Sequence, residues 1–289
     1  MSLPGTATTN KAGRPWTFKS LHPLPVVAVR LMRMMATDDV IFQRVADLIR
    51  ADVTFTAEVL RVANSPLMGR REEIRGIMHA MAVLGLERLK GLVMTVALRN
   101  FLAPGLHVPA LLRCWRHSLA CAAVAEEVAV ANWLDKDRQY TTALLHDLGR
   151  LAMAATYPAD YAAMLEEADS AAAGEASLLE RERERFGADH AQIGQWLSED
   201  WGFPQEFRDI AAHHHDPQPD GDLNALTTIH LSCRIADILG FQAAGSAPAE
   251  TLEDLKPRYT ACCWDRLKPE PELLVSVAGR VNAVECMLL

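Results

Sequence analysis

Apolar residues recur along this chain at intervals of three and four positions, which is the spacing of one face of an α-helix. The chain shows no convincing set of alternating apolar and polar positions, the pattern of strands. The sequence therefore predicts an all-α fold. The first helix is expected after two prolines that suit a helix entrance. Its apolar stripe comprises Val26, Val29, Leu31, Met32 and Met35.

Ala-rich segments continue the helical pattern through the middle of the chain, over residues 110–131, 138–155, 159–170 and 175–185. The sequence LERERERFG at 179–187 alternates charges, as a solvent-facing helix does. A stretch rich in Pro, Gly and Ala over 240–250 leads to a tail with two further expected helices. At the other end, residues 1–20 are expected to form a flexible leader, without the apolar segment of a secretory signal.

Length and charge limit the classes of protein. The 289 residues suffice for one large domain or two small ones around a hydrophobic core. The net charge of −8 argues against general nucleic-acid binding, because phosphate contacts need a basic surface. No stretch approaches the roughly 20 apolar residues that a membrane helix needs, so no membrane partner is expected.

The cysteines indicate the redox environment. Six occur, and none forms a CxxC pair. Cys114 and Cys121 lie on one face of a predicted helix, so we expect them to be core thiols. A reducing cytoplasm is the simplest location for such a chain.

Candidate chemistry begins with the sequence TALLHDLGRLAM, which places His146 and Asp147 side by side in an apolar run. Burying a charged Asp beside a His costs several kcal/mol unless a partner compensates the charge. His117 shares an apolar helix face with the two core cysteines. His190 opens a helix, Asp237 lies on another apolar face, and three histidines end a short helix: His213, His214 and His215.

Each of these residues alone has an ordinary structural explanation. A buried His commonly bonds a backbone carbonyl, and His near a helix C-terminus is mildly favourable. Imidazoles and carboxylates that face inward from several helices are, however, what a metal site in a helical bundle needs. Such mixed nitrogen and oxygen ligands suit Fe, Mn, Zn, Ni or Co better than Mg or Ca.

Two groups of motifs resemble a known family. LPVVAVRLM, RVANSPLMG and VLGLERLKGLV resemble the N-terminal helical half of HDOD domains, the HD-related output domains of bacterial signalling. CWRHSLACAAVAEEVA, ALLHDLGRLAM, RERFGADHAQIGQWLSEDWGFP and HHHDP resemble the HD-related half. The resemblance runs from about Leu21 to Leu239, and RVANSPLMG with VLGLERLKGLV separates HDOD domains from general HD phosphohydrolases.

This resemblance implies an HDOD-type helical fold, in which an N-terminal helical lobe packs on an HD-like helical core. It places the HDOD domain at residues 21–240, divided into an N-terminal lobe at 21–110 and an HD-like lobe at 111–240. Residues 241–289 are then a C-terminal helical extension.

The resemblance also implies a ligand set, carried over by position, for a divalent transition metal such as Fe, Mn, Zn or Ni. Its members are His117, His146, Asp147, His190, His214, His215 and Asp237. The partner of Asp147 would then be a metal ion. The sequence leaves open whether His213 rather than His215 belongs to the pair.

For function, the resemblance implies a regulatory output module of bacterial signal transduction that binds protein partners and has no catalytic residues. The alternative is a metal-dependent phosphohydrolase for a nucleotide or cyclic dinucleotide, with His146, Asp147 and Arg150 taking part. A third reading is nucleotide binding without turnover. Two departures argue against catalysis. No Gly-Tyr-Pro segment follows the His pair, and Arg150 stands where HD-GYP phosphodiesterases usually carry Lys.

Overall fold

The computed structural model describes residues 14, 24, 26–35, 42–65, 73–170, 175–216, 221–245 and 250–288. Every regular element in these ranges is a helix, which confirms the predicted all-α class. No helix among them is long and apolar enough to cross a bilayer. Of the predicted leader, only Arg14 is described, and its buried guanidinium pairs with Glu199 and Asp200.

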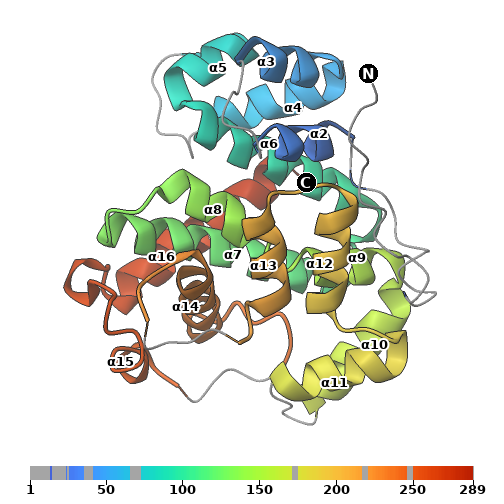
Figure 1. Ribbon diagram of the computed structural model, residues 1–289, viewed down its shortest axis with the longest axis vertical. Coiled ribbons are helices and arrows are strands. Elements are labelled where there is room, and N and C mark those ends of the chain that lie inside the picture. Colours follow the sequence, from blue (N-terminus) through green and yellow to red (C-terminus); the bar gives the residue numbers. More distant parts are fainter. Residues whose placement is uncertain are drawn as a thin grey trace, which may run out of the picture.

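Five helices form a lobe at one end of the molecule, at the top of Figure 1. They are α2 (Val26–Met35), α3 (Phe42–Arg50), α4 (Val53–Ala63), α5 (Ile77–Leu84) and α6 (Leu86–Leu102). α6 is buried over most of its length and reaches the second half of the fold, where it contacts α8. The predicted stripe on α2 is shifted, because Val26 is 64% exposed whereas Ala28, Leu31 and Met32 are fully buried.

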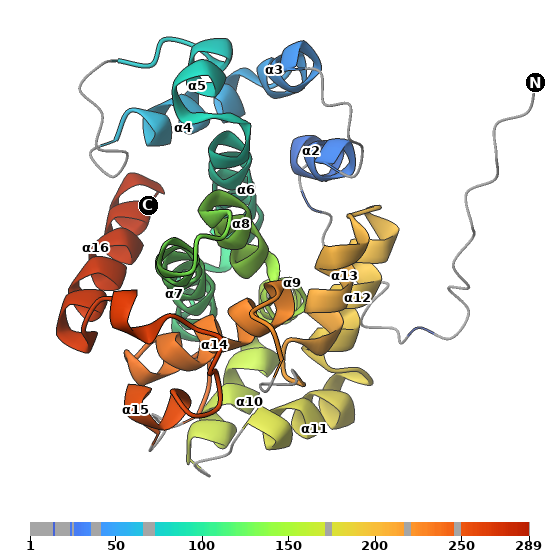
Figure 2. The same ribbon diagram turned by 60° about the vertical axis from the view of Figure 1, so that its left-hand side comes forward.

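The second half is built around one central helix. Its elements are η3 (Ala103–Gly105), α7 (Pro109–Ala131), α8 (Lys136–Leu145), α9 (Leu148–Thr156), α10 (Pro158–Ser170), α11 (Glu175–Phe186), α12 (His190–Asp200), α13 (Gln205–His213) and α14 (Ala225–Ile238). α8 and α14 pack against α7 (Figure 2). α7 is buried on almost all sides, which explains why its sequence is apolar and Ala-rich rather than amphipathic.

The prediction of one helix over residues 138–155 is wrong at the His146–Asp147 doublet. α8 ends at Leu145 and α9 begins at Leu148. Asp147 leaves the helical region, with φ −97° and ψ 22°. Apolar spacing cannot reveal this break, because the apolar positions continue in register through it. The break directs the doublet toward α7, α12 and α14.

A glycine brings α9 close to α12. A Cβ at Gly149 would lie 2.0 Å from the His190 carbonyl oxygen and 2.5 Å from the Gly194 amide nitrogen. Real side chains do not approach backbone this closely, so only glycine permits the contact. This close packing places the start of α12, and therefore His190, beside the doublet.

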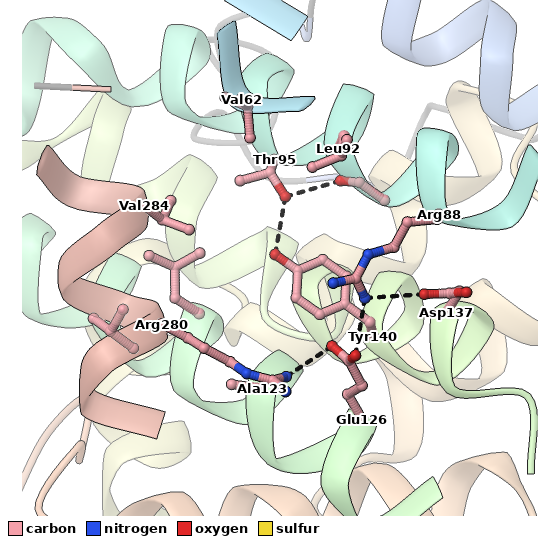
Figure 3. Close-up of a pocket in the computed structure, with 13 residues that line it drawn as sticks. Val62, Arg88, Leu92, Thr95, Ala123, Glu126, Asp137, Tyr140, Arg280 and Val284 are labelled. Atoms are coloured by element: carbon pink, nitrogen blue, oxygen red, sulfur yellow. Dashed lines mark hydrogen bonds and ion pairs between the residues drawn. The ribbon is translucent and has the colours of Figure 1, made fainter. Parts of the chain in front are cut away.

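The C-terminal extension contains α15 (Leu252–Leu255), η4 (Trp264–Arg266) and α16 (Glu270–Leu288), and α16 packs on α7 and α4. A small cavity of about 70 Å³ lies where α16 meets both halves (Figure 3). Beside it, Glu126 of α7 accepts hydrogen bonds from Arg88 of α6, at 2.9 Å, and from Arg280 of α16, at 2.8 Å. The buried apolar residues of both halves and of α16 form one continuous core.

Candidate metal centre

The doublet sits in the interior of the second half. His146 caps the C-terminus of α8, and Asp147 precedes α9. The two residues are 2% and 1% exposed. An acidic group at this depth needs compensating partners, and the surrounding helices supply them.

Asp147 is the centre of the cluster. Its Oδ1 lies 3.3 Å from His190 Nε2 and 3.4 Å from His214 Nε2. Its Oδ2 lies 3.8 Å from His146 Nε2 and 3.9 Å from His117 Nε2. The structure therefore brings side chains from α7, from α12 and from the C-terminal caps of α8 and α13 to one carboxylate.

The remaining predicted ligands lie around this centre. His215 Nε2 is 2.7 Å from His190 Nε2. His213, by contrast, is exposed, so His214 and His215 are the pair that faces the cluster. Asp237 lies at the edge, where its Oδ1 is 3.5 Å from His117 Nδ1 and its side chain is 22% exposed.

Four imidazoles are oriented by acceptors on their Nδ1 side. His117 Nδ1 donates to the Phe241 carbonyl at 2.8 Å, and His146 Nδ1 donates to the Ala143 carbonyl at 2.5 Å. His214 Nδ1 lies 3.1 Å from two carbonyls of α13. His190 Nδ1 donates to a carboxylate at 2.7 Å. Each Nε2 is thus turned toward the interior, as in histidines that ligate metals.

The carboxylate that holds His190 belongs to Glu182, and the sequence analysis missed it. Glu182 lies in the LERERERFG segment predicted to face solvent, yet its side chain is fully buried. It accepts from Tyr161 Oη at 2.5 Å as well as from His190. Burial opposes its negative charge, but His190 and Arg150 outweigh burial and lower its pKa. The alternating charges of this segment did not predict that Glu182 is a buried acceptor for His190.

Arg150 compensates the charge of Asp147. Its Nε lies 2.7 Å from Asp147 Oδ2, and its Nη2 lies 3.1 Å from His190 Nε2. Burial alone would raise the pKa of Asp147. Arg150 and the imidazoles of His146 and His190 outweigh that effect and hold the pKa well below its ordinary value. The guanidinium, only 2% exposed, is thus part of the cluster itself.

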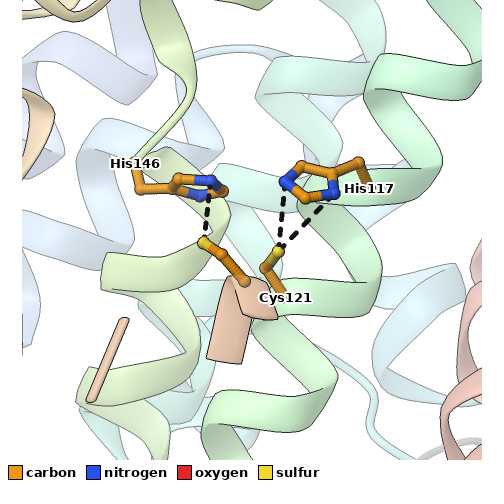
Figure 4. Close-up of side chains that lie close together, drawn as sticks. His117, Cys121 and His146 are labelled. Carbon is orange, nitrogen blue, oxygen red and sulfur yellow. Dashed lines mark hydrogen bonds between the residues drawn. The ribbon is translucent and has the colours of Figure 1, made fainter. Parts of the chain in front are cut away.

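Two cysteines also join the cluster. Cys121 Sγ lies 3.4 Å from His117 Nε2, as Figure 4 shows, and Cys233 Sγ lies 3.3 Å from His146 Nε2. Cys121 is buried as expected, but neither thiol was expected at the site. Their spacing could have predicted it, because residues four apart share a helix face. Cys121 follows His117 by four residues, and Cys233 precedes Asp237 by four.

The thiols perturb their neighbours. Burial opposes the charged form of His117, but Cys233, Asp237 and Asp147 outweigh it and raise the pKa to about 9. The hydrogen bond with Cys121 and the nearby imidazoles lower the pKa of the Cys233 thiol, against the effect of burial. The cluster therefore favours protonated imidazole together with deprotonated thiol and carboxyl groups.

A cavity of about 450 Å³ adjoins the cluster. His117, Asp147 and Arg150 line its inner wall, and Asp237 and Arg234 line another part. Arg234 and Arg258 both pair with Glu250, which compensates part of their charge. The cavity has room for a small ligand next to the buried imidazoles.

The donor atoms fall into two sets, each with all atoms within 4.8 Å of one another. One set is His117, Cys121, His146 and Cys233, and the other is Asp147, His190, His214 and His215. The residue types and the oriented imidazoles of both sets fit a transition metal. In the second set, however, Arg150 already lies against Asp147 and His190.

Residues 21–217 of the chain match the HDOD domain family. The chain matches no curated protein. Among solved structures it is similar to an HDOD domain protein of unknown function from Geobacter sulfurreducens, at 22% identity and a TM-score of 0.69. That match covers 92% of this chain and 93% of the other.

Two further structures have the same fold. One is a protein from Shewanella amazonensis, provisionally named a phosphohydrolase, at 20% identity and a TM-score of 0.69, covering 96% of this chain and 99% of that one. The other, from Marinobacter aquaeolei, is provisionally named a signal transduction protein. It is 19% identical with a TM-score of 0.69, and the match covers 92% of this chain and 60% of that one.

Proposed function

Because this chain belongs to the HDOD domain family, we propose that it is a regulatory output module of bacterial signal transduction, acting in the cytoplasm without turnover of a substrate. In this proposal the buried cluster holds the core in shape, and the surface binds protein partners. The provisional name of the similar Marinobacter protein, a signal transduction protein, agrees with this role.

The position of Arg150 carries the proposal. Its guanidinium lies against both Asp147 and His190, 2.7 Å and 3.1 Å away, inside the donor set that a catalytic metal would need. A divalent ion bridging those two residues would lie close to this fixed positive charge. At an effective dielectric constant of 20, two unit charges 4 Å apart repel by about 4 kcal/mol, and a divalent ion by about twice that. Hydrolysis by a metal ion bound between Asp147 and His190 is therefore disfavoured.

The seven predicted metal ligands then act mainly as a hydrogen-bonded and ionic network. A divalent transition metal, from among Fe, Mn, Zn and Ni, fits best on the side of His117 and His146, away from Arg150. Asp147, His190, His214, His215 and Asp237 complete the network around it.

Protein partners are expected at the N-terminal lobe. Val26, Phe42, Val53 and Met78 are large apolar side chains exposed there. A Phe42→Ser/Val53→Ser variant of the full chain should lose the signalling partner, whereas Val275→Ser, at an exposed position of α16, should keep it. Co-purification with tagged chains from the native cytoplasm measures this. If the wild type and both variants all retain the partner, the partner surface does not include Phe42 and Val53.

A turnover screen tests the absence of catalysis. The full chain is loaded with Mn²⁺ or Fe²⁺ and offered cyclic dinucleotides, nucleotides and generic phosphate esters. We expect no product above the level of a His146→Ala control. Turnover that this substitution abolishes would overturn the proposal.

The second candidate is a phosphohydrolase, or a nucleotide-binding module without turnover, and the cavity favours it. The 450 Å³ space reaches the cluster and has Arg234 and Arg258 on its wall. Binding of a nucleotide by calorimetry, weakened by Arg258→Ala, would support the binding module. Turnover in the screen above would support the hydrolase, with His146, Asp147 and Arg150 in the reaction.

A further inference from the structure

We propose that His117, Cys121, His146 and Cys233 form a tetrahedral Zn²⁺ site that joins three helices of the core. The inference rests on the proposed function in one respect, that the buried cluster holds the core in shape, because a zinc ion closed by four protein donors has no open position for a substrate. The two proposals nevertheless fail in different experiments, as described below.

The donor geometry is close to that of bound zinc. Cys121 Sγ lies 3.4 Å from His117 Nε2, and Cys233 Sγ lies 3.3 Å from His146 Nε2. All four donor atoms lie within 4.8 Å of one another. Zn–S bonds of about 2.3 Å and Zn–N bonds of about 2.0 Å give donor–donor separations of roughly 3.3 to 3.8 Å. Two separations thus already lie close to these values, and the others, at most 4.8 Å, need to close by roughly 1.5 Å or less.

The helices bring these donors together without backbone rearrangement. His117 and Cys121 are four residues apart and project from the same face of α7. His146 caps α8, and Cys233 lies on α14. The carbonyls of Phe241 and Ala143 accept from Nδ1 of the two rings and so leave each Nε2 for the metal. Figure 4 shows both rings facing the sulfur atoms.

The chemistry of the donors selects the metal. Thiolates favour Zn²⁺ over Mg²⁺ or Mn²⁺, and four protein donors fill a tetrahedral zinc site without leaving a position for water. Asp147 is the competing ligand at this point, with Oδ2 3.9 Å from His117 Nε2. Since Arg150 lies 2.7 Å from the same oxygen, Cys121 and Cys233 are the better donors.

Cobalt substitution tests the ligand set, because Co²⁺ bound by thiolate gives a near-ultraviolet charge-transfer band that imidazole and carboxylate ligands do not give. The full chain is purified under reducing conditions, stripped with a chelator and titrated with Co²⁺. We expect one Co²⁺ per chain with this band, and displacement by Zn²⁺. Zn²⁺ should also raise the Tm of the stripped chain by about 5 °C or more.

Matched variants locate the donors. Cys121→Ser and Cys233→Ser should each weaken Co²⁺ binding at least about tenfold and reduce the band. Cys114→Ser, another buried cysteine of α7, should change neither. Co²⁺ that binds the wild type without the band, or no binding at all, would overturn the zinc site even if the serine variants fail to fold. A thiolate band together with substrate turnover would keep the site and overturn the proposed function.

Discussion

At the scale of single residues, Arg150 most changes the interpretation of the cluster. From the sequence, this arginine was a candidate to take part in phosphate-ester hydrolysis. The structure instead pairs it with Asp147, the carboxylate next to the conspicuous histidine. The structure therefore gives the buried carboxylate of Asp147 a positively charged partner within the protein.

Arg150→Ala should destabilise the fold by about 3–5 kcal/mol, because it leaves a buried carboxylate without its main counter-charge. Arg138→Ala, which breaks an exposed pair with Glu206, should cost at most about 1 kcal/mol. Urea unfolding measures both. Millimolar Mn²⁺ should restore part of the loss in Arg150→Ala only. Equal stabilities of the two variants would contradict the role of Arg150.

His230, on the cavity wall, should make stability depend on pH. Its Nδ1 accepts from Tyr259 Oη at 2.7 Å, and burial lowers its pKa to about 4. An unfolded His titrates near 6.5, so the unfolded state binds protons first and stability falls between pH 6.5 and 4. His230→Gln should show a shallower fall in unfolding free energy than the wild type over this range. Parallel curves would refute this assignment.

At the scale of elements, the sequence predicted helices well and their ends less well. Periodicity located α10 and α11 to within a residue or so, because an apolar face determines a surface helix. It missed the break at the doublet, since Asp147 changes backbone direction without changing the apolar spacing. Glu182 was missed because its burial depends on contacts with Tyr161 of α10 and His190 of α12, which charge alternation cannot express.

The close contact between α9 and α12 gives a prediction at this scale. Gly149→Ala should destabilise by about 2 kcal/mol or more, because its Cβ would lie 2.0 Å from a backbone oxygen. Gly279→Ala is the matched control on α16, with no atom within 4 Å of the added Cβ. It should stabilise by about 0.5–1 kcal/mol, as expected for replacing an exposed helical glycine. Thermal melts of the two variants that shift in the same direction would contradict this contact.

At the scale of the whole molecule, α16 connects the two halves through Glu126. That carboxylate is 5% exposed and bonds Arg88 of the N-terminal lobe and Arg280 of α16 (Figure 3). The sequence around Glu126 is apolar and did not predict that this residue of α7 pairs with arginines of two other helices. The candidate metal centre depends on α7 as well, because α7 provides His117 and Cys121.

Glu126→Gln should therefore lower the free energy of unfolding by about 1–3 kcal/mol, since two arginines lose a charged acceptor. Glu253→Gln removes one partner of an exposed pair with Lys256 and should cost at most about 1 kcal/mol. Chemical denaturation compares them. Indistinguishable unfolding midpoints would show that the ion pairs of Glu126 contribute no more stability than an exposed pair.

The central claim is that Arg150 supplies the positive charge beside Asp147 and His190, at the place where a metal ion would otherwise bind. Crystals of the full chain soaked in excess Mn²⁺ and Zn²⁺ test this claim most directly. Anomalous scattering at each absorption edge locates every bound ion. We predict no peak within bonding distance of Asp147, with the Arg150 guanidinium still against its Oδ2. A peak bridging Asp147 to His190 or His214, with Arg150 displaced, would contradict the account.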